Sequence, residues 1–450
     1  MRIVLIYLFF LFAVKCESQN TEVFASSSLT PPMGWNSYDC FGMNVTEAEV
    51  KANADFMAQN LKEFGYEYVV VDFLWFGDNF TQDNWQSKTA PQFIDKFGRV
   101  IPSEKLHPSA AGGKGFKPLA DYMHARGLKF GIHIMRGIPW NAVEKNLRIK
   151  GTHYRLQDIV SMHDTCKWYG GMRGINFDKK GAQAYVNSLF ELYASWGVDF
   201  VKVDDISFPY HKNDIEAIHK AVLHCGRPMA ISLSPGAAPI DKANHLAENA
   251  DMWRISPDFW DSWPALQHQF EMARIWAPYS KPGSWPDADM LPVGNLSVRS
   301  ELKTHHPRTS NFTPDEQYSM LTLWSMMRSP LMIGSNLPGL DEFTLSLLTN
   351  KEVLEVNQKS TNGKELFASG DTIVWVAENP ERKVKYIAFF NHNDSIVKTI
   401  SVRLSDIGLN DKETYTVYDI WNKNNLANAK EVISTKVKPH GTVFLKLSIN

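Results

Sequence analysis

A single unit recurs along most of this chain: an amphipathic helix, a closing glycine, and a short apolar strand that ends on a polar residue. In the first copy, Thr46 and Glu49 stand at the spacing of a helix capping box, Gly65 ends the helix, and the strand YEYVVVD ends at Asp72. Helices that alternate with apolar strands predict parallel strands, buried on both faces and joined by right-handed crossovers. The closing glycines and strand ends of the other three copies are Gly127 and His133, Gly197 and Asp204, and Gly226 and Ser234.

Four weaker strands complete the pattern. They lie at 33–36 (MGWN), 250–254 (ADMWR), near 285 (GSW) and 330–334 (PLMIG). Eight such strands predict an α/β fold, a (β/α)8 TIM barrel over residues 29–350. A doubly wound open sheet is the competing arrangement, but it usually binds phosphates through a glycine-rich first turn, and no GxGxxG or P-loop motif follows the first strand.

The pattern changes from about Glu355 to short alternating strands separated by Gly, Asn and Asp turns, with no helical period between them. This segment predicts a C-terminal antiparallel β-sandwich over residues 355–450. It carries no catalytic constellation, so we expect a structural or peripheral role for it.

The N-terminus resembles an export signal. Arg2 precedes an apolar run from Ile3 to Val14, which is too short to span a bilayer as a helix. We therefore expect a signal peptide over residues 1–18 and an extracytoplasmic protein, secreted or periplasmic. A lipid anchor at Cys16 is the less favoured alternative because the charged Lys15 precedes it, and no later segment predicts a membrane span.

Charge and cysteine content exclude several kinds of partner. A net charge of −2 provides no basic field for nucleic acid. The cysteines beyond the signal, Cys40, Cys166 and Cys225, are odd in number and widely spaced, which argues against a disulfide framework or a zinc site. At most one bridge can join two of these three cysteines, and the sequence does not specify an oligomeric state.

The 14 Trp, 15 Tyr and 26 Phe suit a neutral sugar partner, although most of them are expected to fill the core.

The chemistry of a barrel lies at the C-terminal ends of its strands, where this chain places polar residues. Retaining hydrolysis of an acetal needs one carboxylate to attack and one carboxylic acid to protonate the leaving oxygen. Lys202 and Asp204 share one face of their strand, so the ammonium is expected to keep that carboxylate ionised and Asp204 to be the nucleophile. Asp258 follows Arg254 by four positions on a loop broken by Pro257, and it is the expected acid/base. Polar residues at or just beyond the predicted strand ends are Asp72, His133, Lys202, Asp204, Ser234, Arg254 and Asp258.

Around these positions the chain resembles glycoside hydrolase family 27, which comprises α-galactosidases, melibiases and α-N-acetylgalactosaminidases. The similarity covers residues 29–450. Its most specific pieces are TPPMGWNSY at 30–38, YEYVVVD at 66–72, GLKFGI at 127–132, WGVDFVKVD at 196–204, WRISPD at 253–258, SWPDADML at 284–291 and EQYSMLTLWSMMRSPLMIG at 316–334.

The resemblance implies a role for each matching residue. Asp204 becomes the nucleophile of a KxD motif that includes Lys202, and Asp258 becomes the acid/base. The implied substrate-binding residues are Asp72, Lys202, Arg254, Asp289 and Tyr38, to which the strand-end residues His133 and Ser234 are added. No metal or organic cofactor is implied, and the implied partner is a small, oligomeric or polymeric glycoside.

Two departures from the family pattern bear on specificity. Phe73 replaces the second aspartate of the usual IDDxW motif, which removes a ligand for the region of the sugar O6. His133, the HIMRG continuation and GGKGF at 112–116 resemble a subgroup that includes β-L-arabinopyranosidases, and β-L-arabinopyranose is α-D-galactose without its hydroxymethyl group. The small Ser234 and Ala237 resemble instead an N-acetylgalactosaminidase pocket, and Ile206 and Leu233 replace a pair of family cysteines.

These observations predict a retaining exo-glycosidase that releases terminal α-D-galactose by double displacement. The alternatives are β-L-arabinopyranosidase and then α-N-acetylgalactosaminidase. A sugar-binding protein on an inactive barrel is the non-enzyme alternative, and the retention of both Asp204 and Asp258 argues against it.

Overall fold

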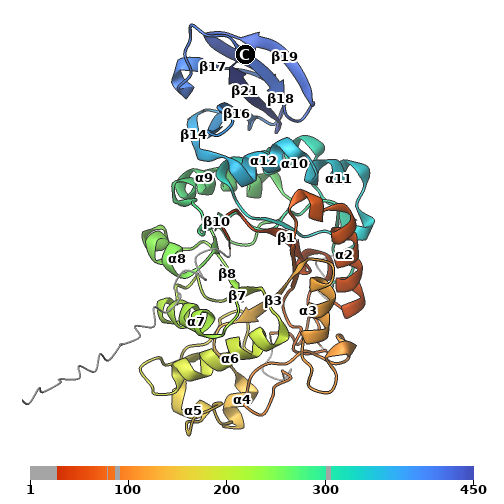
Figure 1. Ribbon diagram of the computed structural model, residues 1–450, viewed down its shortest axis with the longest axis vertical. Coiled ribbons are helices and arrows are strands. Elements are labelled where there is room, and N and C mark those ends of the chain that lie inside the picture. Colours follow the sequence, from red (N-terminus) through yellow and green to blue (C-terminus); the bar gives the residue numbers. More distant parts are fainter. Residues whose placement is uncertain (1–27, 79, 87–91, 301–305, 450) are drawn as a thin grey trace, which may run out of the picture.

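The computed structural model describes residues 28–78, 80–86, 92–300 and 306–449, so the predicted signal peptide and Cys16 lie outside the described residues. Its larger part is an eight-stranded parallel sheet in the order β10-β9-β8-β7-β3-β2-β1-β13 (Figure 1). Leu291, just beyond β10, bridges Ile333 of β13 in parallel, so the two edges of the sheet meet. The predicted (β/α)8 barrel is therefore confirmed. The strands are β1 (Met33–Asn36), β2 (Tyr68–Val71), β3 (Lys129–Met135), β7 (Phe200–Asp204), β8 (Ala230–Leu233), β9 (Met252–Arg254), β10 (Trp285–Asp287) and β13 (Leu331–Ile333).

Between successive strands, and after the last one, a helix covers the outside of the barrel (Figure 1). The capping box of Thr46 and Glu49 is present at the start of α2, and the closing glycines have positive φ angles, as at Gly65 (100°) and Gly197 (85°). Glycine adopts this conformation without a steric penalty, which is why the unit could be recognised from sequence. The helices are α2 (Glu47–Asn60), α3 (Lys117–His124), α6 (Ala182–Trp196), α7 (Lys212–His224), α8 (Ala243–Asn249), α9 (Trp263–Trp276), α10 (Pro314–Met327) and α12 (Lys351–Lys359).

Shorter helices and strands lie in the connections between the barrel strands and their helices. The long connection from β3 to α6 contains a small antiparallel sheet in the order β4-β6-β5, and β11 pairs with β12 between β10 and α10. These elements are α1 (Tyr38–Phe41), β4 (Ile138–Pro139), α4 (Trp140–Glu144), α5 (Leu156–Ile159), β5 (Val160–Ser161), β6 (Met172–Ile175), β11 (Asn295–Leu296), β12 (Arg308–Thr309) and α11 (Glu342–Leu348). The sequence did not predict them because such short strands carry no measurable alternation.

The C-terminal region is a two-sheet antiparallel sandwich, as predicted. One sheet has the order β14-β15-β16-β21-β18-β19 and the other consists of β17 and β20. The first strand starts at Thr361, because residues 355–359 belong to α12. The strands are β14 (Thr361–Ser369), β15 (Thr372–Asn379), β16 (Val384–Asn391), β17 (Lys398–Arg403), β18 (Tyr415–Asp419), β19 (Asn424–Ala429), β20 (Val432–Val437) and β21 (Thr442–Ile449).

Side-chain alternation in the large sheet divides the core of this region. Trp375 and Phe390 belong to the same buried cluster as the barrel helices, whereas Val374 and Phe389 belong to a second cluster between the two sheets. The ring centroids of Phe270 on α9 and Phe390 on β16 lie 4.8 Å apart. One face of the large sheet thus extends the barrel core, and Figure 1 shows the sandwich stacked against α9, α10 and α12.

Two further findings concern the described residues. Cys40, Cys166 and Cys225 are free thiols. Within these residues no helix combines the length and the apolar character that crossing a bilayer would require.

Candidate active site

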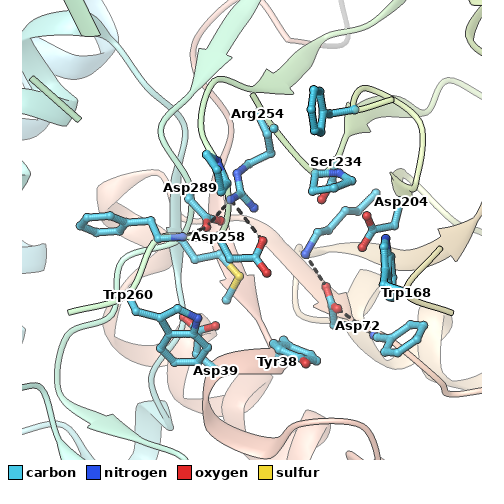
Figure 2. A pocket seen from close by; sticks show the side chains of 18 of the residues that line it. Tyr38, Asp39, Asp72, Trp168, Asp204, Ser234, Arg254, Asp258, Trp260 and Asp289 are labelled. Atoms are coloured by element: carbon cyan, nitrogen blue, oxygen red, sulfur yellow. Dashed lines mark hydrogen bonds and ion pairs between the residues drawn. The ribbon is translucent and has the colours of Figure 1, made fainter. Parts of the chain in front are cut away.

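A cavity of about 470 Å³ opens at the C-terminal ends of the barrel strands. Eight of the nine predicted site residues line it: Tyr38, Asp72, Lys202, Asp204, Ser234, Arg254, Asp258 and Asp289. They come from strands or loops far apart in the chain, and those that Figure 2 labels have side chains that converge on one space. The barrel topology therefore gathers the strand-end residues, because parallel strands direct all their carboxyl ends to the same rim.

The buried Asp72 and the partly buried Lys202 form an ion pair on one side of the cavity. Lys202 Nζ donates to Asp72 Oδ2 at 3.0 Å, and Asn36 Nδ2 donates to the same oxygen at 2.6 Å. Burial raises the pKa of Asp72, but attraction from Lys202 and His133, together with hydrogen bonds from Asn36 and the Phe73 N–H, outweighs burial and holds the pKa well below its usual value. Asp72 is thus a permanent hydrogen-bond acceptor, and Lys202 is a permanent donor.

The side chain that bonds Asp204 differs from the one that the sequence indicated. His133 Nε2 lies 3.1 Å from Asp204 Oδ2, and because a carboxylate only accepts, this nitrogen carries the donated hydrogen. Burial opposes ionisation, but the hydrogen bond from His133, with attraction from His133 and Lys202, holds the pKa of Asp204 below its usual value. Lys202 therefore acts on Asp204 through space, while its hydrogen bond goes to Asp72.

His133 was predicted to bind substrate, and the structure places it elsewhere. Its side chain is 0% exposed and does not line the cavity. β3 extends two residues past His133, so the histidine lies within the strand and behind Asp204. This position suits a residue that orients the carboxylate and does not touch the sugar.

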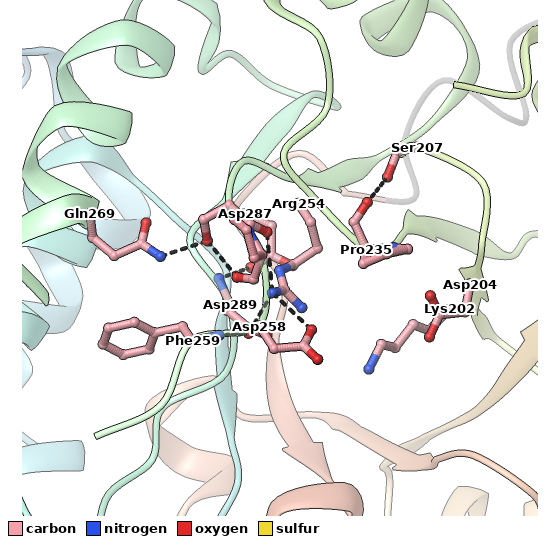
Figure 3. A network of polar contacts seen from close by, with 12 residues as sticks. Lys202, Asp204, Ser207, Pro235, Arg254, Asp258, Phe259, Gln269, Asp287 and Asp289 are labelled. Atoms are coloured by element: carbon pink, nitrogen blue, oxygen red, sulfur yellow. Dashed lines mark hydrogen bonds and ion pairs between the residues drawn. The ribbon is translucent and has the colours of Figure 1, made fainter. Parts of the chain in front are cut away.

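Asp258, Arg254 and Asp289 form the opposite side of the cavity (Figure 3). Arg254 Nη2 lies 2.7 Å from Asp289 Oδ2 and 3.3 Å from Asp258 Oδ1. The Phe259 backbone N–H also donates to Asp289 Oδ2 at 2.7 Å. The side chains of Arg254 and Asp289 are buried, whereas that of Asp258 is 71% exposed and can exchange a proton with water.

The arrangement fits double displacement. Asp204 and Asp258 reach the same cavity from β7 and from the loop after β9, and Figure 3 shows the Asp258 carboxyl turned toward Lys202 and Asp204. The Asp204 carboxylate is only 15% exposed and is held ionised, while the Asp258 carboxyl group is open to solvent. A sugar ring between them would meet a nucleophile on one face and a proton donor on the other.

Loops contribute cavity residues that sequence reasoning missed. Trp85 and Trp168 join Phe73, which the sequence had already singled out, in an aromatic wall beside Asp72, and Phe208 and Trp260 add rings elsewhere on the lining. Loop tryptophans were the available signal, but the chain has 14 Trp and nothing local separates a lining ring from a core ring. The other lining residues not predicted to bind substrate are Asp39, Pro235, Gly236, Pro257, Phe259 and Met290.

Ala237 is absent from this lining, although the sequence placed it with Ser234 in one wall. Pro235 and Gly236 occupy that wall instead. A Cβ on Gly236 would lie 2.1 Å from the Ser256 backbone oxygen, so only glycine fits there.

Among the described residues, no group of three or more His, Cys, Asp or Glu is arranged to hold a metal ion.

Two family models match the chain: one described as alpha galactosidase A, over residues 162–359, and one described as the alpha galactosidase C-terminal beta sandwich domain, over 369–447. The chain is 29% identical to alpha-galactosidase A of Cellvibrio japonicus, covering 97% of this chain and 96% of that protein. Alpha-galactosidase 2 of Arabidopsis thaliana is 28% identical, with 94% of this chain and 90% of that protein covered.

Two solved structures are more similar. A family 27 β-L-arabinopyranosidase from Geobacillus stearothermophilus has 47% identity and a TM-score of 0.91, with 94% of this chain and 97% of that chain covered. A protein from Bacillus halodurans, described as a putative α-N-acetylgalactosaminidase, has 42% identity and a TM-score of 0.84, with coverage of 94% and 98%. The chain therefore belongs to glycoside hydrolase family 27, the α-galactosidase family, and is a glycoside hydrolase.

Proposed function

We propose that this enzyme is a retaining exo-glycosidase that releases terminal β-L-arabinopyranose in preference to α-D-galactose. The observation that carries the proposal is the aromatic wall next to Asp72. Phe73 is 4% exposed, and its ring centroid lies 5.6 Å from Trp168 and 6.0 Å from Trp85. This order reverses the one that the sequence favoured, because the galactoside had been placed first.

The aromatic wall disfavours a hydroxymethyl group at C5. Such a group would bring a hydroxyl hydrogen against rings that offer no hydrogen-bond acceptor of ordinary strength, and a buried donor without an acceptor costs about 1–3 kcal/mol. A pyranose that carries only hydrogen at C5 avoids this cost. The 47% identity to a protein described as a β-L-arabinopyranosidase supports the same choice.

The proposed mechanism uses the two carboxyl groups in turn. Asp204 attacks the anomeric carbon as the C–O bond to the leaving group breaks, and Asp258 gives its proton to the departing oxygen. Asp258 then takes a proton from water, whose oxygen attacks the same carbon and releases Asp204. Asp72, Lys202, Arg254 and Asp289 hold the sugar hydroxyls, and two inversions at one carbon leave the configuration retained.

A panel of p-nitrophenyl glycosides tests the sugar preference. We expect kcat/KM to be highest for the β-L-arabinopyranoside and lower for the α-D-galactopyranoside. Phe73→Asp supplies an acceptor for O6, so it should shift the arabinoside-to-galactoside ratio toward galactoside by about 10- to 100-fold.

Phe73→Leu is the matched control, because it shortens the side chain without adding an acceptor and should keep the preference for arabinoside. A wild-type enzyme that prefers galactoside, together with an unchanged ratio in Phe73→Asp, would refute the proposed specificity.

A second candidate, α-N-acetylgalactosaminidase, rests on the cavity wall at Ser234 and Gly236, where a small side chain and a residue without a side chain leave room for an acetamido group. The 2-acetamido-2-deoxy-α-D-galactopyranoside belongs in the same panel. It becomes the preferred function if its kcat/KM exceeds that of both other substrates.

We also propose that residues 1–18 direct export. Supporting this is the apolar run from Ile3 to Val14 behind Arg2. N-terminal sequencing of the protein from an exporting host should begin at Gln19, and an intact Met1 on the exported protein would contradict it.

A further inference from the structure

Arg136 lies directly behind the candidate nucleophile. It follows the last residue of β3, is 4% exposed and does not line the cavity. Its backbone N–H donates to the Asp204 carbonyl oxygen at 3.2 Å. Its side-chain Nε donates to the Asp205 carbonyl oxygen at 2.7 Å and lies 3.1 Å from Asp205 Oδ2. Arg136 thus holds the turn that carries Asp204 through three contacts.

That turn has an unusual backbone. Asp205 has a φ of 57°, in the left-handed region that residues other than glycine seldom adopt. Such a conformation persists where surrounding contacts fix it. The Arg136 contacts to the Asp205 carbonyl and carboxylate supply that restraint on the residue next to Asp204.

The terminal nitrogens of the same guanidinium bind a different loop, the one that contains Asp164. Arg136 Nη1 and Nη2 donate to the two carboxylate oxygens of Asp164 at 2.9 and 2.7 Å, a bidentate pair. The Asp164 carbonyl in turn accepts from the Gly174 N–H at 2.7 Å. A Cβ on Gly174 would lie 2.1 Å from Asp164 Oδ2, so this carboxylate is packed closely against the backbone.

The Asp164 loop carries part of the cavity wall. Trp168 lies four residues further along the chain, lines the cavity, and packs against Phe73. Tyr169 also packs against Phe73, with centroids 5.2 Å apart. A shift of Asp164 would therefore move the rings that face the C5 position of the sugar.

We propose that Arg136 is a positioning residue that couples the nucleophile to the aromatic wall, so that one buried guanidinium sets both the rate of attack and the selectivity at C5. The selectivity part rests on the proposed function, whereas the coupling does not. The guanidinium is planar and reaches both loops at once, which a lysine ammonium cannot do.

The charges around Arg136 determine which variants are informative. Asp164, Asp205 and Asp214 all attract it, and Asp205 and Asp214 are buried. Removing the cation would leave buried carboxylates uncompensated, which destabilises strongly. Arg136→Lys keeps the charge, and Asp164→Asn breaks only the link to the Trp168 loop, at a side chain that is 32% exposed.

The test measures two quantities for each variant. The first is kcat/KM for the arabinoside and for the galactoside, and the second is the rate of the first step, measured with the matching glycosyl fluorides as substrates. Arg136→Lys should lower kcat/KM about 10- to 100-fold, because misplacing a reacting group by a fraction of an ångström costs that much. Asp164→Asn should keep the first-step rate on the better substrate within about threefold, and narrow the ratio between the two sugars by about tenfold.

Arg99→Lys is the matched control. Arg99 is also buried, pairs with Asp95, and donates to the Ser188 carbonyl oxygen at 2.9 Å on the outer helix α6, without lining the cavity. We expect Arg99→Lys and Arg136→Lys to lower the melting temperature by similar amounts. Arg99→Lys should leave both the rate of the first step and the arabinoside-to-galactoside ratio unchanged.

Kinetics of Arg136→Lys and Asp164→Asn indistinguishable from those of Arg99→Lys would overturn the proposal. If Arg136→Lys does not fold, Asp164→Asn decides alone, and an unchanged sugar ratio refutes the coupling. If the wild type instead prefers galactoside, while Arg136→Lys still lowers kcat/KM and Asp164→Asn still narrows the ratio between the two sugars, the coupling stands and only the proposed function fails.

Discussion

Asp72 and Asp204 stand at the ends of β2 and β7, the two strands that flank β3, and they receive different partners. Asp72 accepts from the Lys202 ammonium, whereas Asp204 accepts from the His133 ring. Both carboxyl pKa values are held below their usual range despite burial. A fixed negative charge suits Asp72 as a hydroxyl acceptor and Asp204 as a nucleophile, so two different donors produce the same ionised state for two different roles.

The hydrogen bond to Asp204 makes a prediction about pH. Because the carboxylate form attacks, the acidic limb of kcat/KM follows the pKa of Asp204, and a lowered pKa extends activity to lower pH. His133→Leu removes the donor, so the pKa of Asp204 rises and the limb moves to higher pH. His133→Gln retains an N–H and should move it less. A pH profile of His133→Leu whose acidic limb coincides with that of the wild type would contradict this role.

The two carboxyl groups should also respond differently to removal. Asp204→Ala should abolish turnover, and azide should not restore activity with retained configuration. Asp258→Ala should still release p-nitrophenolate in the first step, since a good leaving group needs no proton, and should then stall because water lacks its base. For Asp258→Ala, a rapid burst of p-nitrophenolate followed by slow turnover identifies this behaviour. Substantial hydrolysis by Asp204→Ala would show that Asp204 is not the nucleophile.

At the scale of elements, local signals at helix ends account for the success of the barrel prediction. The capping box at α2 is complete: Glu49 N–H donates to Thr46 Oγ1 at 3.3 Å, and Thr46 N–H donates to Glu49 Oε2 at 2.8 Å. Strands β19 and β20 lacked an equivalent signal. Their residues are mostly exposed, so their sequences carry little apolar alternation.

The capping box can be tested by stability. Thr46→Ala removes the acceptor for the Glu49 N–H and should lower the free energy of unfolding by about 1 kcal/mol. Ser195→Ala is the comparison, because Ser195 is exposed and donates only to the Leu192 carbonyl within α6; its effect should stay within about 0.5 kcal/mol. Denaturant titration of both variants checks the difference, and equal effects would refute the cap.

At the scale of the whole molecule, barrel and sandwich share one hydrophobic core. The cluster that contains the barrel strands continues through α9 to Trp375, Phe390 and Phe444 of the sandwich. His440 of the sandwich also contacts two barrel helices. Its ring stacks on Trp263 of α9 with the centroids 3.9 Å apart, and its Nδ1 lies 2.7 Å from Oε1 of Glu316 in α10. The sandwich therefore covers an apolar flank of the catalytic barrel, which gives it a structural role without catalytic residues.

This shared core predicts a single cooperative unfolding transition. Phe270→Ala, at the contact with Phe390, should cost about 3–5 kcal/mol and lower the temperature of that one transition. Phe208→Ala, at a side chain 59% exposed, should leave it nearly unchanged. Scanning calorimetry distinguishes the outcomes, and two separate transitions in the wild type would contradict a continuous core.

Several features of this enzyme were predictable from the sequence because they are local. Helix caps, closing glycines and apolar strands repeat along the chain, and they predict parallel strands whose ends meet at one rim. Asp72, Lys202, Asp204, Arg254 and Asp258 could be identified as candidates because each stands at or just after a strand end, and all of them line the cavity.

Only the tertiary structure decided how those residues are paired and what surrounds them. The register of β3 against β7 places His133 beside Lys202 in the sheet and behind Asp204, so the lysine turns to Asp72. Folding of the β3–α6 connection brings Trp168 to Phe73 and Asp164 to Arg136. Periodicity reports which way a side chain faces within its own element, whereas contacts between elements depend on register and loop path, which no short segment of sequence encodes.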